Sequence, residues 1–310
     1  MDFGKLPQEQ LNNVDFTLPA EPVDNRLVLT GKRAGKPQVY LGVPRSGDKS
    51  WIGRVYPKGT KEAGFMEQYV KHFNCIELNA THYKIYSPAE IGKWAARAEG
   101  REFKFCPKVP QLISHYSNFS NVFDQTSAFL EGVLAFEEHL GPIFLQVSES
   151  YAPNRREPLF KYLASLPTDL TFFLEVRHPQ WFSDPVIKKE LFDTLRTLKI
   201  GAVITDTSGR RDCAHMHLTV PKTFVRFVCN LLHPTDYTRS DAWVERITHW
   251  INDGLEELYM FVHMPDEMYC PELIAYLIDK LNPACDLHLQ KPQFIQPGKP
   301  AGGTQISFFD

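Results

Sequence analysis

The sequence predicts an α/β protein built as a single (β/α)8 barrel of the TIM type. Eight short runs rich in β-branched and aromatic residues alternate along the chain with helical stretches or loops. They lie between residues 38 and 282, and one closed barrel usually takes roughly 250 residues. Polar or charged residues follow at or soon after the end of each run, where such barrels place their active sites.

The eight runs are interpreted as parallel strands. Short apolar runs that are buried on both faces and separated by helices are typical of βα units. The predicted strands are Val39–Val43, Cys75–Asn79, Glu102–Pro107, Ile143–Val147, Thr171–Val176, Gly201–Thr205, Phe224–Val228 and Leu258–His263.

Helices are predicted where apolar residues recur every three or four positions. Such stripes lie in residues 65–73, 129–140, 187–198, 243–251 and 273–281. The third has Pro185 in its first turn, with Ser183 or Asp184 as its cap. Residues 207–223 show no clean helix, so the sixth crossover is predicted to be a long loop over the barrel mouth.

The two ends differ from the barrel. Residues 1–37 are polar and interrupted by Gly4, Pro7, Pro19 and Pro22, which predicts an arm lying on the barrel domain at 38–282. Residues 283–310 are predicted to be a flexible tail. Its segment KPQFIQPGKPAGGT has three prolines and three glycines, typical of an unfolded linker, and the last six residues turn aromatic.

Composition narrows the classes of function. The chain has 310 residues, is 43% hydrophobic and carries a formal net charge of -3, so no overall basic field favours nucleic acid or a membrane surface. Any anion binding must be local. Six scattered cysteines without a CxxC motif indicate small core residues in a reducing compartment. No signal-like stretch or long apolar run is present, and we expect a cytoplasmic protein.

Polar side chains at the strand ends converge on one rim in a barrel of this kind. They form the candidate site: Glu77, Asn79 and Tyr83 after strand two, Lys108 and His115 after strand three, Gln146 in strand four, Glu175, Arg177, His178 and Trp181 at strand five, Asp206 after strand six, Arg226 in strand seven and His263 in strand eight.

The residue types favour an anionic ligand. Lys108, Arg177 and Arg226 supply about three positive charges in a concave site, and the arginine fork matches phosphate. The carboxylates Glu77, Glu175 and Asp206 are the candidate bases or ligands of a divalent metal, and His115 is the candidate acid. A divalent metal is possible at these residues, but the spacing of the ligands does not indicate one.

Structural interpretations of the same residues remain open. Glu175 and Arg177 can form a purely structural ion pair, His178 can orient a turn, and His263 can be a satisfied buried group. His215 and His217 alternate like two metal ligands but have no visible third. No phosphate-binding glycine loop and no GxSxG elbow occurs.

The order and spacing of several segments resemble the YecE-like family, a bacterial TIM-barrel domain of unknown function. The segments are VYLGVPRSGDKSWIGRVYP, IELNATHY, FKFCPKVPQLISHY, LGPIFLQV, LTFFLEVRHPQW, ITDT and FVRF, and the resemblance runs from about Val39 to Leu281. It implies a polar pocket at Glu77, Asn79, Lys108, His115, Gln146, Glu175, Arg177, Asp206 and Arg226.

Two strands depart from the family pattern. Phe227-Val228-Cys229-Asn230 replaces a His-Gly continuation, and Val262-His263-Met264 replaces a pair of asparagines. The resemblance therefore implies an altered pocket at strands seven and eight. The family is similar in shape to the endonuclease IV barrel, which is an analogy of fold only.

The end of the tail resembles the pentapeptide with which bacterial proteins dock on the DNA sliding clamp. Its residues are Gln305, Ile306, Phe308 and Phe309. Exposed aromatic residues are unfavourable unless a surface buries them. Docking on the clamp and folding back onto the barrel are both open.

The leading hypothesis is a hydrolase or lyase, for example a phosphoester hydrolase, acting on a phosphate-bearing substrate in the barrel mouth, with nucleic acid and DNA maintenance as one version. The first alternative is a non-catalytic binding barrel that the tail recruits to DNA. The second is a glycoside-processing barrel in which Trp51, Trp181 and Tyr83 stack on a sugar.

Overall fold

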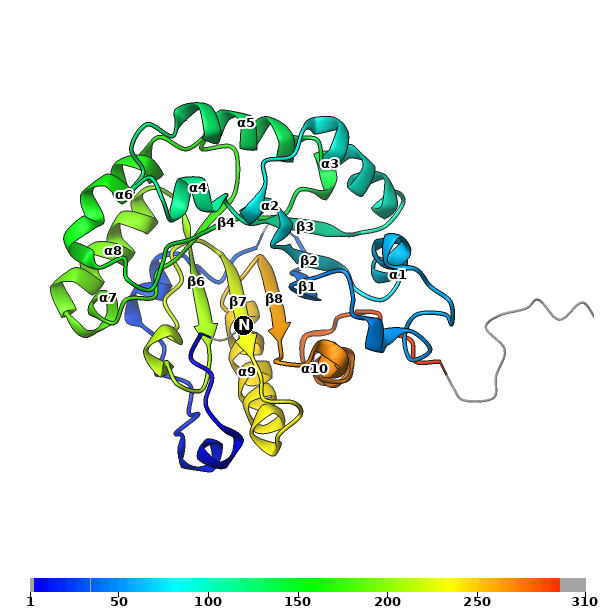
Figure 1. Cartoon of the computed structure of the whole chain (residues 1–310). Helices are drawn as coiled ribbons and strands as arrows, with labels where there is room; N and C mark the ends of the chain where they lie inside the picture. The colour runs from blue at the N-terminus through cyan, green and yellow to red at the C-terminus, as the bar shows by residue number, and fades with distance from the viewer. Residues whose placement is uncertain (1–2, 34, 296–310) are drawn as a thin grey trace, which may run out of the picture.

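Eight parallel strands form the interior of the molecule and helices surround them (Figure 1). The computed structural model describes residues 3–33 and 35–295. Its strands are β1 Gln38–Val43, β2 Cys75–Leu78, β3 Lys104–Pro107, β4 Ile143–Gln146, β5 Phe172–Glu175, β6 Gly201–Asp206, β7 Lys222–Val228 and β8 Glu257–His263. Each lies within two residues of its predicted bounds. The predicted barrel is confirmed.

The strand order is β3-β2-β1-β8-β7-β6-β5-β4, and every paired strand runs parallel to its neighbour. Two isolated bridges, Phe105 to Leu140 and Lys108 to Phe144, join the β3 and β4 regions. The sheet is therefore nearly closed, and all strands end at the same mouth.

The helices are α1 Phe65–Tyr69, α2 Ala80–Tyr83, α3 Pro88–Ala95, α4 Gln111–Ser114, α5 Phe123–Leu134, α6 Arg156–Ala164, α7 Gln180–Ser183, α8 Pro185–Thr197, α9 Pro234–Asn252 and α10 Cys270–Cys285. Asp184 is the cap of α8, because its side chain accepts hydrogen bonds from the backbone of Val186 and Ile187. Residues 207–223 contain one short 3-10 turn, Arg211–Cys213, before β7 begins, as the predicted loop requires.

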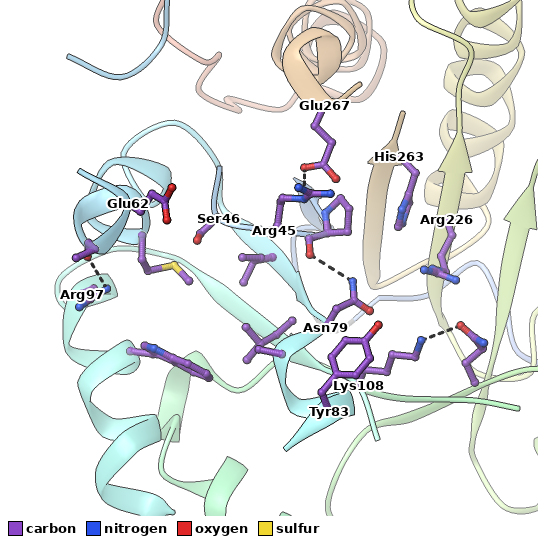
Figure 2. A pocket seen from close by; sticks show the side chains of 18 of the residues that line it. Arg45, Ser46, Glu62, Asn79, Tyr83, Arg97, Lys108, Arg226, His263 and Glu267 are labelled. Atoms are coloured by element: carbon purple, nitrogen blue, oxygen red, sulfur yellow. Dashed lines mark hydrogen bonds and ion pairs between the residues drawn. The ribbon is translucent and has the colours of Figure 1, made fainter. Parts of the chain in front are cut away.

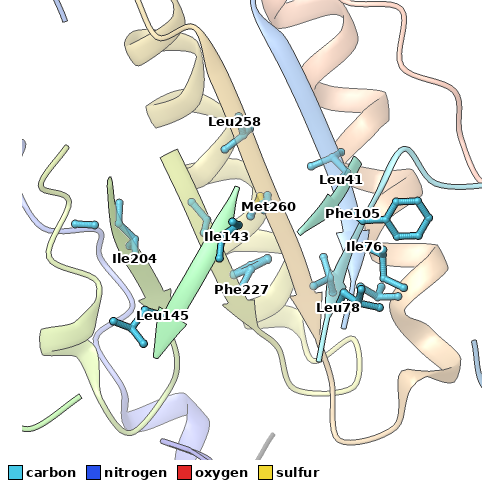
Figure 3. Packing of buried hydrophobic residues seen from close by; sticks show 14 of the residues in the cluster. Leu41, Ile76, Leu78, Phe105, Ile143, Leu145, Ile204, Phe227, Leu258 and Met260 are labelled. Atoms are coloured by element: carbon cyan, nitrogen blue, oxygen red, sulfur yellow. The ribbon is translucent and has the colours of Figure 1, made fainter. Parts of the chain in front are cut away.

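Side chains alternate between the barrel interior and the surrounding helices along each strand. The outward set, which includes Leu41, Ile204 and Leu258, packs between strands and helices (Figure 3). The lower interior is a separate apolar layer made of Tyr40, Cys75, Cys106, Phe144, Phe173, Val203, Phe224, Tyr259 and Phe261. The next inward-facing position toward the mouth is polar, as at Glu77 on β2. The polar site therefore lies directly above this largely aromatic layer.

The N-terminal arm packs on the barrel through two 3-10 turns, Gln8–Asn13 and Val23–Leu27. Its first described residues reach the mouth, where the Phe3 ring lies 4.2 Å from the Arg177 guanidinium carbon. The Thr207 hydroxyl donates to the Gly4 carbonyl. Gly4 has φ +66, and a Cβ there would lie 2.5 Å from a Thr207 carbon, so only glycine fits without a shift.

The C-terminal segment departs from the prediction in part. Helix α10 continues to Cys285, with Pro283 inside it, beyond the predicted barrel end at 282. The chain then stays against the barrel, where the Ile295 amide donates to the Arg54 carbonyl at 2.8 Å. An unfolded linker is therefore wrong for residues 291–295. The predicted docking residues Gln305, Ile306, Phe308 and Phe309 lie outside the described residues.

The burial of the cysteines agrees with the prediction that they are small core residues. Five of the six cysteines are buried, Cys285 is half-buried, and all six are free thiols. Over residues 3–33 and 35–295, no helix combines the length and the apolar character needed to cross a bilayer.

Candidate functional site

A cavity of about 760 Å³ opens at the mouth of the barrel. This size is within the usual range for small-molecule sites. Seven of the residues that the sequence predicts as ligand contacts line it, namely Asn79, Tyr83, Lys108, Gln146, Arg177, Arg226 and His263.

Arg226 joins two carboxylates at the base of this cavity. Its Nε and Nη2 donate to the two oxygens of Glu77 at 2.9 and 2.8 Å, and its Nη1 donates to Glu175 Oε2 at 2.8 Å. All three side chains are at most 4% exposed. We call Glu77, Glu175 and Arg226 the lumen cluster, because all three point into the barrel.

Neighbouring groups complete the hydrogen bonding of both carboxylates. Glu77 is bonded by His263 Nε2 at 3.0 Å and Asn79 Nδ2 at 2.9 Å. Glu175 Oε1 accepts from Arg177 Nε and from the Thr205 hydroxyl, each at 2.8 Å. The two carboxylates are therefore held in place from both sides of the barrel.

The arginines decide the ionisation of these carboxylates. Burial opposes the charge on Glu77, but Arg226 and His263 outweigh it and hold the pKa well below its usual range. In the same way, burial is outweighed by Arg177 and Arg226 at Glu175, whose pKa is lowered to about 2. Both groups stay ionised at neutral pH and are weak bases there.

Lys108 is a buried cation with a neutral partner. Its Nζ donates to Gln146 Oε1 at 2.9 Å. Over the described part of the chain, no carboxylate oxygen lies within 4.0 Å of Lys108 Nζ, which is the limit for an ion pair. Burial and the nearby Arg226 lower the pKa of Lys108 to about 8. Lys108, Arg177 and Arg226 thus stand beside Glu77 and Glu175, and Arg177 Nη1 also lies 3.9 Å from the exposed carboxylate of Glu149.

Two further charged residues at the cavity were not predicted from the sequence. Arg45 Nε and Glu267 Oε2 lie 2.8 Å apart across the mouth (Figure 2). Burial raises the pKa of Glu267 to about 7, although Arg45 acts in the opposite direction. They follow β1 and β8, so the strand-end rule used for the other residues also applies to them.

The cavity continues past β2 toward α1 and α3. Met66 on α1 and Trp94 on α3 line this outer part together with Arg97. Figure 2 shows Arg97 and Glu62 at this end, and Lys108, Arg226 and His263 at the other. No sequence pattern indicates the outer part, because the position of α3 over β2 depends on the path of the loops.

Asp206, a predicted catalytic residue, is not brought to the cavity. Its Oδ1 lies 3.0 Å from Arg239 Nη2, and its Oδ2 accepts from Trp243 Nε1 at 2.8 Å. Arg239 also pairs with Asp236 at 3.5 Å. We call Asp206, Asp236 and Arg239 the sealed cluster, since all three are fully buried. Thr205 points into the barrel, so the next residue on the strand points out toward α9.

His115, His178 and Trp181 were predicted at the site, but they do not line the cavity. His115 bonds Ser114 Oγ at 2.8 Å, and burial with Lys108 nearby lowers its pKa to about 4, so it is neutral at pH 7. His178 Nδ1 accepts from the Gln180 amide at 3.3 Å, in the turn that it was alternatively expected to orient.

Two tryptophans proposed for sugar stacking are core residues. Trp181 and Trp51 are both fully buried. Their indole N–H groups donate to the carbonyls of Tyr151 and Glu267, at 2.8 and 2.9 Å. Neither ring presents a face to the cavity, whereas Tyr83, at 72% exposure, stands at its rim.

The described residues contain no group of three or more histidine, cysteine, aspartate or glutamate side chains placed to hold a metal ion. His215 and His217, the pair with alternating spacing, pack on Phe192, and the His217 ring centre lies 3.9 Å from that ring. This packing is typical of structural histidines.

Comparison with known proteins gives consistent matches over most of the chain. The model of a family described as protein of unknown function DUF72 matches residues 40–296. The UPF0759 protein YecE of Escherichia coli K12 is 26% identical over 262 residues, covering 79% of this chain and 93% of that protein, and its O157:H7 counterpart gives the same values.

Solved structures support the same fold. Two crystal structures of a DUF72 family protein from Enterococcus faecalis V583 match with TM-scores of 0.61 and 0.58, each at 14% identity. They cover 84% and 81% of this chain and 99% of the other in both cases. At this identity the likeness concerns the fold alone.

Proposed function

The chain belongs to the DUF72 family, whose function is unknown, and we propose that it is an enzyme that binds a phosphate-bearing substrate in the barrel mouth. The observation that carries the proposal is Lys108, a cavity-lining ammonium that is 7% exposed and bonded to a neutral amide. A buried charge is costly unless an opposite charge compensates it. A bound anion supplies that charge.

The lumen cluster holds the anion site in shape. Arg226 is fixed by Glu77 and Glu175, so its charge lies beside Lys108 without the freedom to leave. Arg177, held by Glu175, adds a third positive charge at the same wall of the cavity. An enzyme that fixes charges in advance does not have to reorganise them when substrate binds.

Glu267 is the residue that we propose as the general base. Its pKa of about 7 is close to neutral pH, which favours proton transfer there, whereas Glu175 at about 2 is a poor proton acceptor. Glu267 would take a proton from a water whose oxygen attacks the phosphorus of an ester held at Lys108. The P–O bond to the leaving group would break, and the alkoxide would take up the proton from Glu267 to leave as the alcohol. The roles predicted from sequence for Glu77, His115 and Glu175 stay predictions, whereas Asp206 lies away from the cavity and has no part in this step.

Sulfate binding followed against pH by calorimetry tests the anion site. Sulfate does not titrate in this range, so any change reports the protein. Affinity is expected to weaken as Glu267 ionises near pH 7 and to fall roughly a further tenfold by pH 9, because Lys108 loses its proton near pH 8. Lys108→Arg should keep binding at pH 9, since arginine remains charged.

Lys108→Gln should abolish sulfate binding, with the exposed-lysine variant Lys161→Gln on α6 as the matched control. Equal affinity of wild type and Lys108→Gln at pH 7 would falsify the anion site. The same conclusion follows if both lysine variants lose binding together.

A non-catalytic ligand-binding barrel is the second candidate, because the arginines already satisfy both lumen carboxylates. Turnover of a phosphomonoester by wild type, reduced about a hundredfold or more in Glu267→Gln, decides for the enzyme. Sulfate binding without turnover decides for the binding barrel. Clamp docking by the tail stays a separate prediction outside the described residues, and so does a nucleic-acid substrate.

A further inference from the structure

The cavity has two parts of different chemistry. The inner part, inside the barrel, carries Lys108, Arg177 and Arg226. The outer part lies beyond β2 and has mainly apolar walls, with the charged side chains of Glu62 and Arg97 at its end. The apolar residues are Ala63, Met66, Ile76, Leu78, Ala80 and Trp94. A ligand with its anion on Lys108 therefore has an apolar wall beside it.

The register of β2 explains how the two parts are joined. Glu77 points into the barrel, and its neighbours Ile76 and Leu78 point out toward the helices. All of this stretch is buried by protein, yet Ile76 and Leu78 still line the cavity. The cavity thus passes over the end of β2, from the barrel interior to the space beside α1 and α3.

Trp94 is the main apolar element of the outer part. It is half-buried on α3, a helix whose N-terminus is stabilised by a capping box of Ser87 and Glu90. Its ring centre lies 4.7 Å from that of Tyr86, which fixes the indole from one side. Met66, 7% exposed, is a polarizable neighbour on the same cavity. A fixed indole with a methionine beside it is suited to a flat ring.

We propose that the outer part is a binding subsite for an aromatic ring, so that the ligand class is a small organic monophosphate ester with a flat apolar group. This inference rests on the proposed function, because it places the phosphate at Lys108. The cavity volume of about 760 Å³ accommodates a ligand of this size. Phe3 and Gly4 of the arm cover the opposite side of the mouth at Arg177 and Thr207, which directs a ligand toward α1 and α3.

Calorimetry with inorganic phosphate and phenylphosphonate, which has no ester bond to hydrolyse, tests the subsite. Phenylphosphonate is expected to bind at least about tenfold more tightly, since it buries a ring that inorganic phosphate lacks. Trp94→Ala should remove this difference and leave the affinity for inorganic phosphate unchanged. Trp94→Phe, which keeps a ring, should retain part of the difference.

Phe160→Ala on α6 is the matched control, because it also removes a half-buried aromatic ring from a helix, away from the cavity. It should leave both affinities unchanged. Equal affinity of the two ligands for wild type overturns the ring subsite, as does an undiminished preference in Trp94→Ala, and both leave the anion site standing. Failure of both ligands to bind overturns the proposed function itself.

Discussion

The lumen cluster and the sealed cluster contain the same chemical groups, two carboxylates and one arginine, yet they differ in what surrounds them. Arg226 of the lumen cluster lines the cavity, and the buried cation Lys108 stands beside it. Arg239 of the sealed cluster projects from α9 against the barrel, where it donates to the Asp206 and Val228 carbonyls, and the Trp243 indole donates to the Asp206 carboxylate. The first arrangement places Arg226 and Lys108 at a cavity, whereas in the second Arg211 also pairs with Asp206, so that two arginines face two carboxylates away from the cavity.

The difference teaches that a charged residue at a strand end is not by itself a site residue. Thr205 and Asp206 are neighbours at the end of β6, and only Thr205 reaches the lumen carboxylate Glu175. The side-chain alternation of a strand decides which of two neighbours meets the ligand. Charge pairing alone therefore does not separate a functional cluster from a structural one.

The largest expected effects come from removing the two arginines. Arg226→Met and Arg239→Met each leave buried carboxylates without their main partner, so each should lower the free energy of unfolding by about 3–5 kcal/mol in urea denaturation. Sulfate should raise the stability of wild type and Arg239→Met but not of Arg226→Met. Loss of the sulfate effect in a folded Arg239→Met protein would show that the two clusters are coupled.

The pH dependence of the free energy of unfolding gives a second test of the Arg226→Met variant. In wild type the pKa of Glu175 is depressed to about 2, so its stabilising contribution is complete above its ordinary value of 4.5 and is lost as pH falls toward 2. Without Arg226 the pKa rises. The variant's carboxylates then take up protons as pH falls from 7 to 5, and its deficit in stability relative to wild type should shrink over that range.

A smaller effect is expected at the two neighbours on β6. Thr205→Val removes a hydroxyl that donates to Glu175, which should cost about 1 kcal/mol and raise the pKa of Glu175 in a carboxyl NMR titration. Asp206→Asn should leave the pKa of Glu175 and the affinity for sulfate unchanged, because its side chain faces α9. A shift of the Glu175 pKa in Asp206→Asn alone would contradict the assigned register.

The fold was predictable from the sequence because buried parallel strands have a local signature, and the pocket residues followed from their position at strand ends. Glu77, Lys108, Glu175 and Arg226 were brought together as predicted. Asp206 was predicted at the site because it follows the last residue of the predicted strand, but side-chain alternation turns it away from the lumen and toward α9. Trp94 was missed because no pattern in the sequence indicates how α3 lies over β2.

The N-terminal arm, which covers Arg177 with Phe3, lies outside the region that the family model matches. The family model begins at residue 40, yet Leu11 and Leu29 are buried, and the Asn25 side chain bonds the backbone of Met216 and Leu218. The unit recognised by homology is thus smaller than the unit that folds. A fragment that begins at the region shared with the family would expose apolar surface along the barrel wall. It would also lack Phe3, which covers Arg177. The ligand preference of such a fragment would therefore not represent that of the whole chain.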